Sequence, residues 1–109
     1  MITSKSNEYV KYVKSLSQKK YRDESKEFIV EGFKMVKEAI NEAMKIKKII
    51  ISENFHEKID FPDIEVVAEE VFAYISDTQT PQGIMAVVCQ KEKKEISGDL
   101  VFALDRAII

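Results

Sequence analysis

The stretch from Glu27 to Ser52 constrains the fold most, because a strand, a helix and a second strand follow one another with almost nothing between them. The run EFIVEG combines β-branched and aromatic residues and closes at Gly32, which is typical of a strand end. Apolar residues then recur at helical spacing in FKMVKEAINEA, and IKKIIIS reads as another strand. This order predicts a βαβ unit with parallel pairing and a right-handed crossover.

Further elements alternate along the rest of the chain. Ser6 or Asn7 can cap a first helix through EYVKYVKSLSQ, in which valines recur at helical spacing. The polar run KKYRDESK is expected to form a loop or a short extra turn. Strands are predicted in IEVVA, GIMAVVCQ and LVFALD, and a short helix in EEVFAYIS. Such alternation predicts an α/β fold with a central sheet and helices on both faces.

Composition limits the classes of function. The chain has 109 residues, 45% of them hydrophobic and 33% charged, which suits one small soluble domain. Its N-terminus is charged and lacks the apolar core of a secretory signal, and no run is long enough to cross a membrane. Cys89 is the one cysteine and His56 the one histidine, too few for a zinc site or a disulfide within the chain. We therefore expect a cytoplasmic protein.

Charge is distributed unevenly. Residues 1–22 hold six lysines and arginines against one glutamate, so this segment carries 6 − 1 = +5 while the whole chain carries −2. A polyanion would meet this segment rather than the whole surface. The alternative is a solvated helix face with basic side chains.

Two corners combine polar residues with glycine. In VEG, Glu31 stands at a strand tip and Gly32 opens a helix, where backbone amides favour an anion. In TPQG, the positions of Pro81 and Gly83 predict a type I turn that presents Thr80 and Gln82 rigidly. The alternatives are a local capping arrangement and a simple tight turn. Motifs for phosphate loops, nucleophilic serines or metal ligands are absent, so the sequence offers no catalytic residues.

Four motifs in order resemble the N-terminal substrate-binding domain of SpoU/TrmH-type RNA 2′-O-ribose methyltransferases. They are a helix with Asn and Val-Lys, a basic segment, a Phe-x-Val-Glu-Gly strand end and a late Thr-Pro-x-Gly turn. The resemblance covers about residues 3–90, with the motifs at Asn7, Val10-Lys11, Lys19 to Arg22, Phe28 to Gly32 and Thr80 to Gly83.

The resemblance implies a three-layer α/β/α sandwich with a small mixed sheet, similar to ribosomal proteins and kink-turn RNA-binding domains. Residues 1–90 would be the RNA-binding domain, 91–98 a charged linker and 99–109 the first strand of a knotted methyltransferase domain that the sequence lacks. That domain would bind S-adenosylmethionine and form the homodimer. The 109-residue chain is therefore expected to be a monomer that binds RNA but is inactive, without catalytic, cofactor or metal residues. The RNA-contacting residues implied are Asn7, Lys11, Lys19, Lys20, Arg22, Glu31, Gly32, Thr80, Gln82 and Gly83.

Three hypotheses follow from these features. The first is the RNA-binding domain of a ribosomal (or transfer) RNA ribose methyltransferase. The second is a stand-alone kink-turn-type RNA-binding or ribosome-associated protein without enzyme activity, which the reading frame beyond Ile109 would distinguish. The third is a protein-interaction domain that uses the acidic remainder of the chain.

Overall fold

A computed structural model describes residues 1–90, which form four helices and a four-stranded mixed sheet. The elements in chain order are α1 (Glu8–Ser15), α2 (Lys19–Ser25), β1 (Glu27–Glu31), α3 (Phe33–Asn41), β2 (Ile46–Ser52), β3 (Ile64–Val67), α4 (Glu69–Ile75) and β4 (Ile84–Cys89). The α/β fold is therefore confirmed. The predicted linker and the strand in LVFALD lie outside the described residues. No helix in residues 1–90 is both long and apolar enough to span a bilayer.

The sheet order corrects one prediction. The strands lie in the order β1-β4-β2-β3, with β4 antiparallel to both β1 and β2, and β3 parallel to β2. The strands β1 and β2 thus run in the same direction, as expected, but they do not pair, because β4 is inserted between them. The predicted pairing within a βαβ unit is wrong, and the hand of the crossover stays a prediction.

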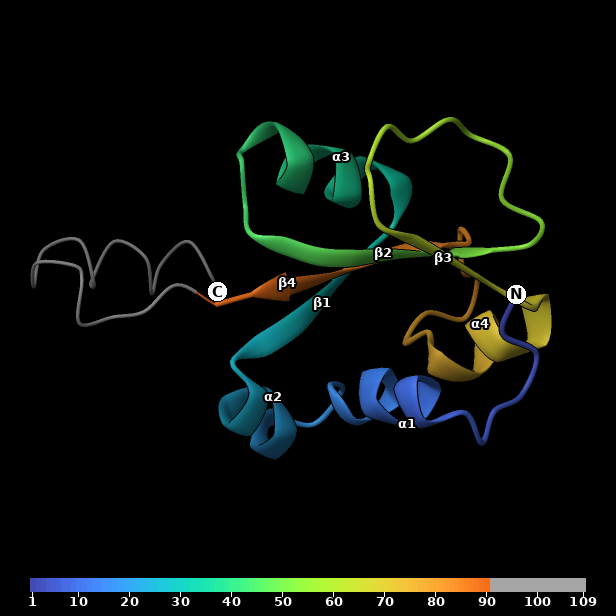
Figure 1. Cartoon of the computed structure of the whole chain (residues 1–109), viewed down its shortest axis with the longest axis horizontal. Helices are drawn as coiled ribbons and strands as arrows, with labels where there is room; N and C mark the ends of the chain where they lie inside the picture. The colour runs from blue at the N-terminus through green and yellow to red at the C-terminus, as the bar shows by residue number, and fades with distance from the viewer. Residues whose placement is uncertain (91–109) are drawn as a thin grey trace, which may run out of the picture.

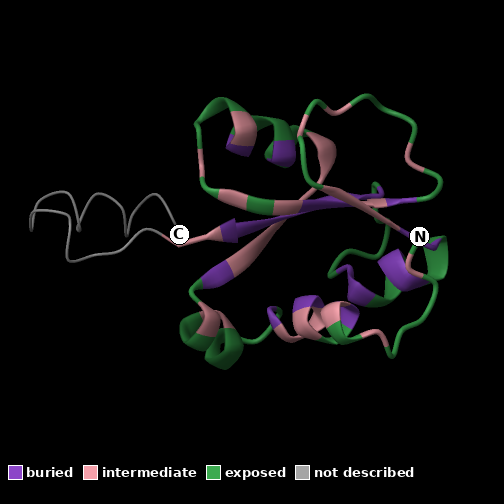
Figure 2. Cartoon of the chain, in the orientation of Figure 1, coloured by how far each residue is buried: buried purple, intermediate pink, exposed green. Residues whose placement is uncertain are grey.

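Strand β4 occupies the centre because its sequence suits burial on both faces. Its residues from Ile84 to Val88 form an unbroken apolar run, and each is fully buried (Figure 2). A strand covered on both faces gains from apolar side chains at every position, whereas a half-exposed strand alternates. The run therefore places the last described strand in the middle of the sheet.

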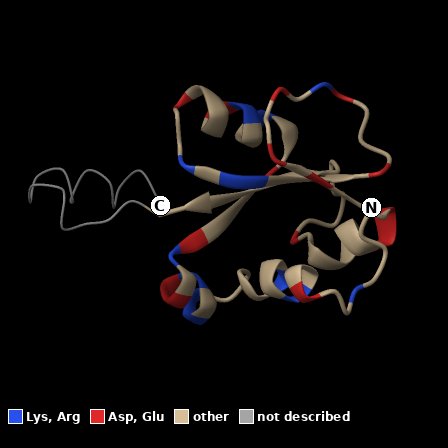
Figure 3. Ribbon diagram, in the orientation of Figure 1, with Lys and Arg blue, Asp and Glu red and all other residues tan. Residues whose placement is uncertain are grey.

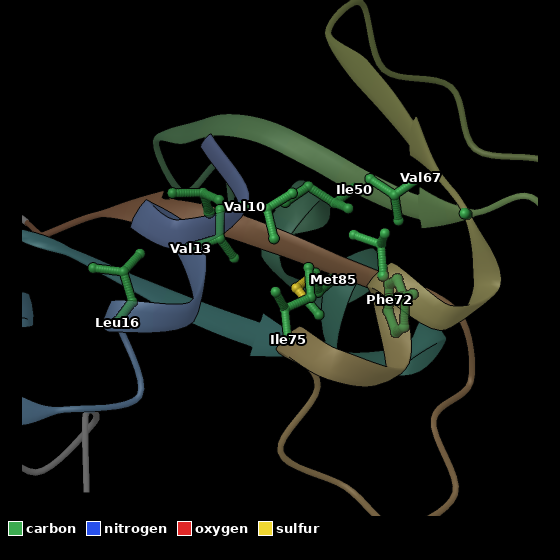
Figure 4. Packing of buried hydrophobic residues seen from close by; sticks show 11 residues of the cluster. Val10, Val13, Leu16, Ile50, Val67, Phe72, Ile75 and Met85 are labelled. Carbon is green, nitrogen blue, oxygen red and sulfur yellow. The ribbon is translucent and has the colours of Figure 1, made fainter. Parts of the chain in front are cut away.

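Helices cover both faces of the sheet. Helix α3 lies on one face, while α1, α2 and α4 lie on the other (Figure 1). The core beneath α3 centres on Val36, Ile49 and Ala86. The core beneath α1 and α4 includes Val10, Val13, Leu16, Ile50, Phe72, Ile75 and Met85, which point toward one another in Figure 4.

The first two helices show how local sequence sets helix ends. The Asn7 side chain caps α1 by accepting from the amides of Tyr9 at 2.9 Å and Val10 at 3.2 Å, so of the two predicted caps Asn7 is the one used. The segment expected to be a loop or short turn is instead the helix α2, which ends at Lys26 in the left-handed region with φ of 60°. Its i,i+4 pair between Lys19 and Asp23, at 2.9 Å, supports the helix.

Candidate nucleic-acid interface

One edge of the sheet gathers the ends of three strands. Because β1, β2 and β3 run in the same direction, their carboxyl ends at Glu31, Ser52 and Val67 share this edge, and β4 begins there at Ile84. Ligands of α/β folds bind in the crevice outside the carboxyl ends of such strands. The loop 76–83, which joins α4 to β4, crosses this edge, so the two polar corners predicted from the sequence meet here.

Glu31 anchors the loop to the strand tip. Its carboxylate accepts hydrogen bonds from the Ser76 hydroxyl and from the Asp77 amide, the latter at 3.3 Å. The Ser76 hydroxyl in turn accepts from the Thr78 amide at 3.2 Å. The carboxylate therefore fixes the first residues of the loop and is partly committed to the protein itself.

Gln82 closes the other side of the corner. Its side-chain oxygen accepts a hydrogen bond from the Phe33 amide at 2.8 Å, across 49 positions of sequence. That amide belongs to the first turn of α3, where no residue of the helix itself can accept from it. Gly32 has φ of +101°, and a Cβ there would lie 3.4 Å from the same Gln82 oxygen. Gln82 thus acts as a helix cap from outside the helix, and its amide nitrogen is the part left to face a ligand.

Gly83 joins the loop to the sheet. It adopts φ of +88°, and its carbonyl accepts from the Ser52 amide at 2.8 Å. Among residues 1–90, no backbone hydrogen bond links Thr80 with Gly83, so the predicted type I turn lacks its closing bond. The loop residues Asp77 to Gln82 are all exposed.

A hollow lies beside this loop. Its volume is about 240 Å³, and it opens between the end of β2, the start of α4 and the end of the loop. Apolar surface from Phe55 and Pro81 alternates there with polar groups from Asn54 and Gln82. A planar group that is apolar on its faces and polar at its edge would match such a lining. Within the described part of the chain, no cluster of three or more His, Cys, Asp or Glu side chains is placed to hold a metal ion.

Figure 3 shows Lys and Arg on both sides of the sheet, and the basic residues expected to contact RNA are those on α1 and α2. Lys11 and Lys20 are exposed. Lys19 is paired with Asp23, and a guanidinium nitrogen of Arg22 donates to the Leu16 carbonyl at 3.0 Å, so both side chains also have structural roles.

Helix α2 packs near the start of β1, whereas Glu31 is the last residue of that strand and Gly32 follows it. Four strand steps of about 3.3 Å separate those ends by roughly 13 Å. The structure therefore brings Glu31, Gly32, Gln82 and Gly83 together with Thr80 on the same loop, and it holds Lys19, Lys20 and Arg22 apart from them. The two remaining expected residues lie at α1. Lys11 is exposed on the helix, and Asn7 is its cap, with a side-chain oxygen that already accepts two bonds.

A polar cluster around Glu27 was not anticipated from the sequence. The carboxylate is 5% exposed and accepts from the Tyr12 hydroxyl, the Lys47 ammonium at 3.1 Å and the Cys89 thiol at 3.6 Å. Burial acts to raise the pKa of Glu27, but the hydrogen bonds from Tyr12 and Lys47 outweigh it and hold the pKa below its ordinary value. Burial and the nearby carboxylate raise the pKa of Cys89, so the thiol is not an activated nucleophile.

The alternation of side chains along β1 could have predicted this cluster from the sequence. Side chains of a strand alternate between faces, so Glu27, Ile29 and Glu31 share the face that packs on α1 and α4. Two carboxylates on a core face require partners, which are here Tyr12 and Lys47 at one end and Ser76 with Asp77 at the other.

Comparisons with known proteins agree on one family. A family model described as the MRM3-like substrate binding domain matches residues 7–86. The 23S rRNA (guanosine(2553)-2′-O)-methyltransferase RlmP of Bacillus subtilis (strain 168) is 30% identical over 107 residues, which are 95% of this chain and 43% of that protein. The chain thus spans less than half the length of this relative.

Solved structures give the same result. An rRNA methyltransferase from Sinorhizobium meliloti superposes with a TM-score of 0.69 at 28% identity, over 83% of this chain and 36% of that one. A structure described as AdoMet-bound rRNA methyltransferase from the same organism gives a TM-score of 0.68 at 28% identity, over the same shares of both chains. A protein described as a TrmH-family RNA methyltransferase from Porphyromonas gingivalis gives a TM-score of 0.64 at 33% identity, over 77% of this chain and 35% of that one.

Proposed function

This chain belongs to the MRM3-like substrate-binding domain family of SpoU/TrmH RNA 2′-O-methyltransferases, and we propose on that basis that it binds RNA. It would be the RNA-binding domain of a cytoplasmic ribosomal or transfer RNA ribose methyltransferase. The names of its relatives support ribosomal RNA as the substrate. The α/β fold with helices on both faces supports the expected likeness to kink-turn RNA-binding domains.

Methyl transfer would belong to a further domain of a longer protein. S-adenosylmethionine would supply the methyl group there, and dimerisation would also use that domain, which the linker 91–98 and residues 99–109 would lead into. The backbone amides at the Gly32 corner, predicted to favour an anion, are already bonded, Gly32 to the Ile84 carbonyl and Phe33 to Gln82, so that prediction is wrong. We therefore assign RNA binding, and no catalytic step, to these residues.

The observation that carries the proposal is that the corner at Glu31 and Gly32 lies next to the loop 76–83 at one edge of the sheet. Glu31 holds one end of the loop 76–83 and the Phe33 amide holds the other through Gln82. A loop fixed at both ends presents its middle with little loss of conformational entropy on binding. Thr80 is exposed in that middle, so its hydroxyl and the neighbouring backbone groups are placed to read ribose or base edges of structured, non-helical RNA.

Glu31 and Gln82 have positioning roles in this proposal. The Glu31 carboxylate shapes the loop, and the Gln82 oxygen caps α3, which leaves the Gln82 amide nitrogen to donate to RNA. Lysines of α1 and α2 would neutralise phosphates of RNA that continues across that side of the molecule. Lys11 and Lys20 fit this role best, because both are exposed and form no ion pair among the described residues.

Fluorescence anisotropy with structured ribosomal RNA fragments at two salt concentrations tests the proposal. The 109-residue chain should bind more weakly as salt rises, because neutralised phosphates release counterions. Lys11→Glu and Lys20→Glu should weaken binding of all fragments similarly, whereas Thr80→Ala should change the preference among fragments.

Lys58→Glu is the matched control, since Lys58 is exposed in the segment between β2 and β3. It should bind as the unaltered chain does. Absence of binding at low salt, or equal losses in Lys58→Glu and Lys11→Glu, would reject the proposed surface.

A further inference from the structure

We propose that Tyr74, with Lys5 and Lys14, forms a stacking site for one unpaired RNA base next to the loop 76–83. The inference rests on the proposed function and adds a contact that neither the sequence motifs nor the comparisons assign. Tyr74 is one of four large apolar side chains that stay exposed in residues 1–90, with 40% of its surface accessible. A tyrosine so exposed has no role in either core.

Three separate segments build this site. Tyr74 lies on α4, Lys14 lies on α1, and Lys5 lies in the segment before α1. The ammonium of Lys14 is 5.0 Å from the centroid of the Tyr74 ring, and that of Lys5 is 5.6 Å from it. Lys14 also donates to the Tyr74 carbonyl at 2.8 Å. The pairing of Ile2 with β3 fixes the chain three residues before Lys5, so the arrangement is held from all three sides.

In the part of the chain that the structure describes, the charges at this site have no carboxylate partner. Neither Lys5 nor Lys14 forms an ion pair among residues 1–90, whereas Lys19 on α2 is paired with Asp23. Both ammonium groups lie over the Tyr74 ring, so a base that stacks there takes their place, and the two lysines then turn outward to the phosphates that flank that nucleotide. An apolar peptide would match the ring but would leave both charges without a partner.

The site is continuous with the proposed RNA surface. Tyr74 precedes Ser76 by two residues, and Ser76 binds Glu31 at the corner. A strand of RNA that leaves the loop toward α1 would therefore reach Tyr74 next. Tyr21 offers a comparison, because it is 37% exposed with the Lys20 ammonium 5.4 Å from its ring centroid, but it lies on α2 away from the loop.

The test compares a single-stranded RNA oligomer with an abasic oligomer of the same length and phosphate count, using anisotropy on the 109-residue chain. We expect the base-containing oligomer to bind more tightly, and Tyr74→Ala to weaken its binding about tenfold while leaving the abasic oligomer nearly unaffected. Tyr74→Phe should retain the preference, because the ring persists. Lys14→Gln should weaken both oligomers, because it removes a phosphate contact.

Tyr21→Ala is the matched control and should keep the preference, and circular dichroism should show that each variant is folded. If structured RNA binds but Tyr74→Ala changes both oligomers equally, or neither, the stacking site is wrong and the proposed function stands. If the unaltered chain binds no RNA of any kind at low salt, both are wrong.

Discussion

At the scale of single residues, Glu27 shows how a buried charge is made tolerable. A carboxylate removed from water is costly unless donors surround it, and Glu27 receives one donor each from α1, β2 and β4. The group therefore connects three elements through one side chain. Its lowered pKa means that folding favours the charged form.

Glu27→Gln is expected to lower stability at neutral pH by about 2 kcal/mol, the usual worth of hydrogen bonds to a charged group. Because the folded pKa lies below the ordinary 4.5, the charge stabilises the fold above that value, and its contribution is lost as pH falls through the folded pKa. The variant should thus lose less stability than the unaltered chain below pH 4.5. Urea unfolding at several pH values measures this, and parallel curves would contradict it.

Tyr9 gives a second test at this scale. Its hydroxyl is buried without a hydrogen-bond partner among the described residues, and burial with the Glu27 charge raises its pKa from 10.0 to about 12. Tyr9→Phe should stabilise the fold by about 1 kcal/mol, because it removes an unsatisfied polar group. A raised pKa favours the protonated fold, so this contribution is present below pH 10.0 and is lost as pH rises toward 12.

Tyr9→Phe should therefore flatten the loss of stability in that alkaline range. Tyr12→Phe is the control, because its hydroxyl donates to Glu27 and its removal should destabilise the fold. Thermal unfolding of both variants at neutral and alkaline pH distinguishes them. Equal destabilisation by the two changes would show that the Tyr9 hydroxyl has a partner.

The contacts of Glu31 and Gln82 show which features of the site the sequence could not predict. The sequence placed Glu31 and Gly32 at a strand tip and Gln82 and Gly83 in a turn, since both have recognisable residue types. It could not show that Glu31 and Gln82 point to each other's segments, because their partners lie 45 to 49 positions away. Such contacts depend on sheet order rather than on local pattern.

At the scale of elements, the presence of each helix or strand was easier to predict than the pairing of the strands. Within residues 1–90, the apolar runs and helical spacing predicted three of the four helices and all four strands, but not the insertion of β4 between β1 and β2. Apolar content indicates that a strand is buried, but not which neighbours bury it. The helix α2 was missed because it buries no side chain, so its sequence carries no apolar period.

Helix α1 offers a test of local stability. Asn7→Ala should destabilise the fold by about 1 kcal/mol, because it removes the side-chain oxygen that accepts from Tyr9 and Val10. Ser6→Ala is the matched control, since among residues 1–90 the Ser6 hydroxyl bonds only with Ser4 and does not cap the helix. Urea unfolding compares the two, and equal losses would show that the cap is not specific to Asn7.

At the scale of the whole molecule, the proposed RNA surface centres on one edge of the sheet. Three strand ends, the α3 start and the loop 76–83 converge there, and the side that α1 covers continues from it through Lys14 and Tyr74. The resemblance seen in the sequence identified the family, and the family model confirms it. The sequence identified the basic segment and the two polar corners as separate features. Only the three-dimensional structure shows that the two corners meet while Lys19, Lys20 and Arg22 lie apart from them.

Mapping of amide chemical shifts on the ¹⁵N-labelled chain during titration with a structured ribosomal RNA fragment would locate the RNA-binding surface residue by residue. If the sheet edge at Glu31 and the loop 76–83 bind RNA, the largest shifts will fall at residues 31–33 and 76–83, with smaller shifts along α1. Shifts confined to the exposed side of α3 and to residues 53–63, with the loop 76–83 unchanged, would contradict it.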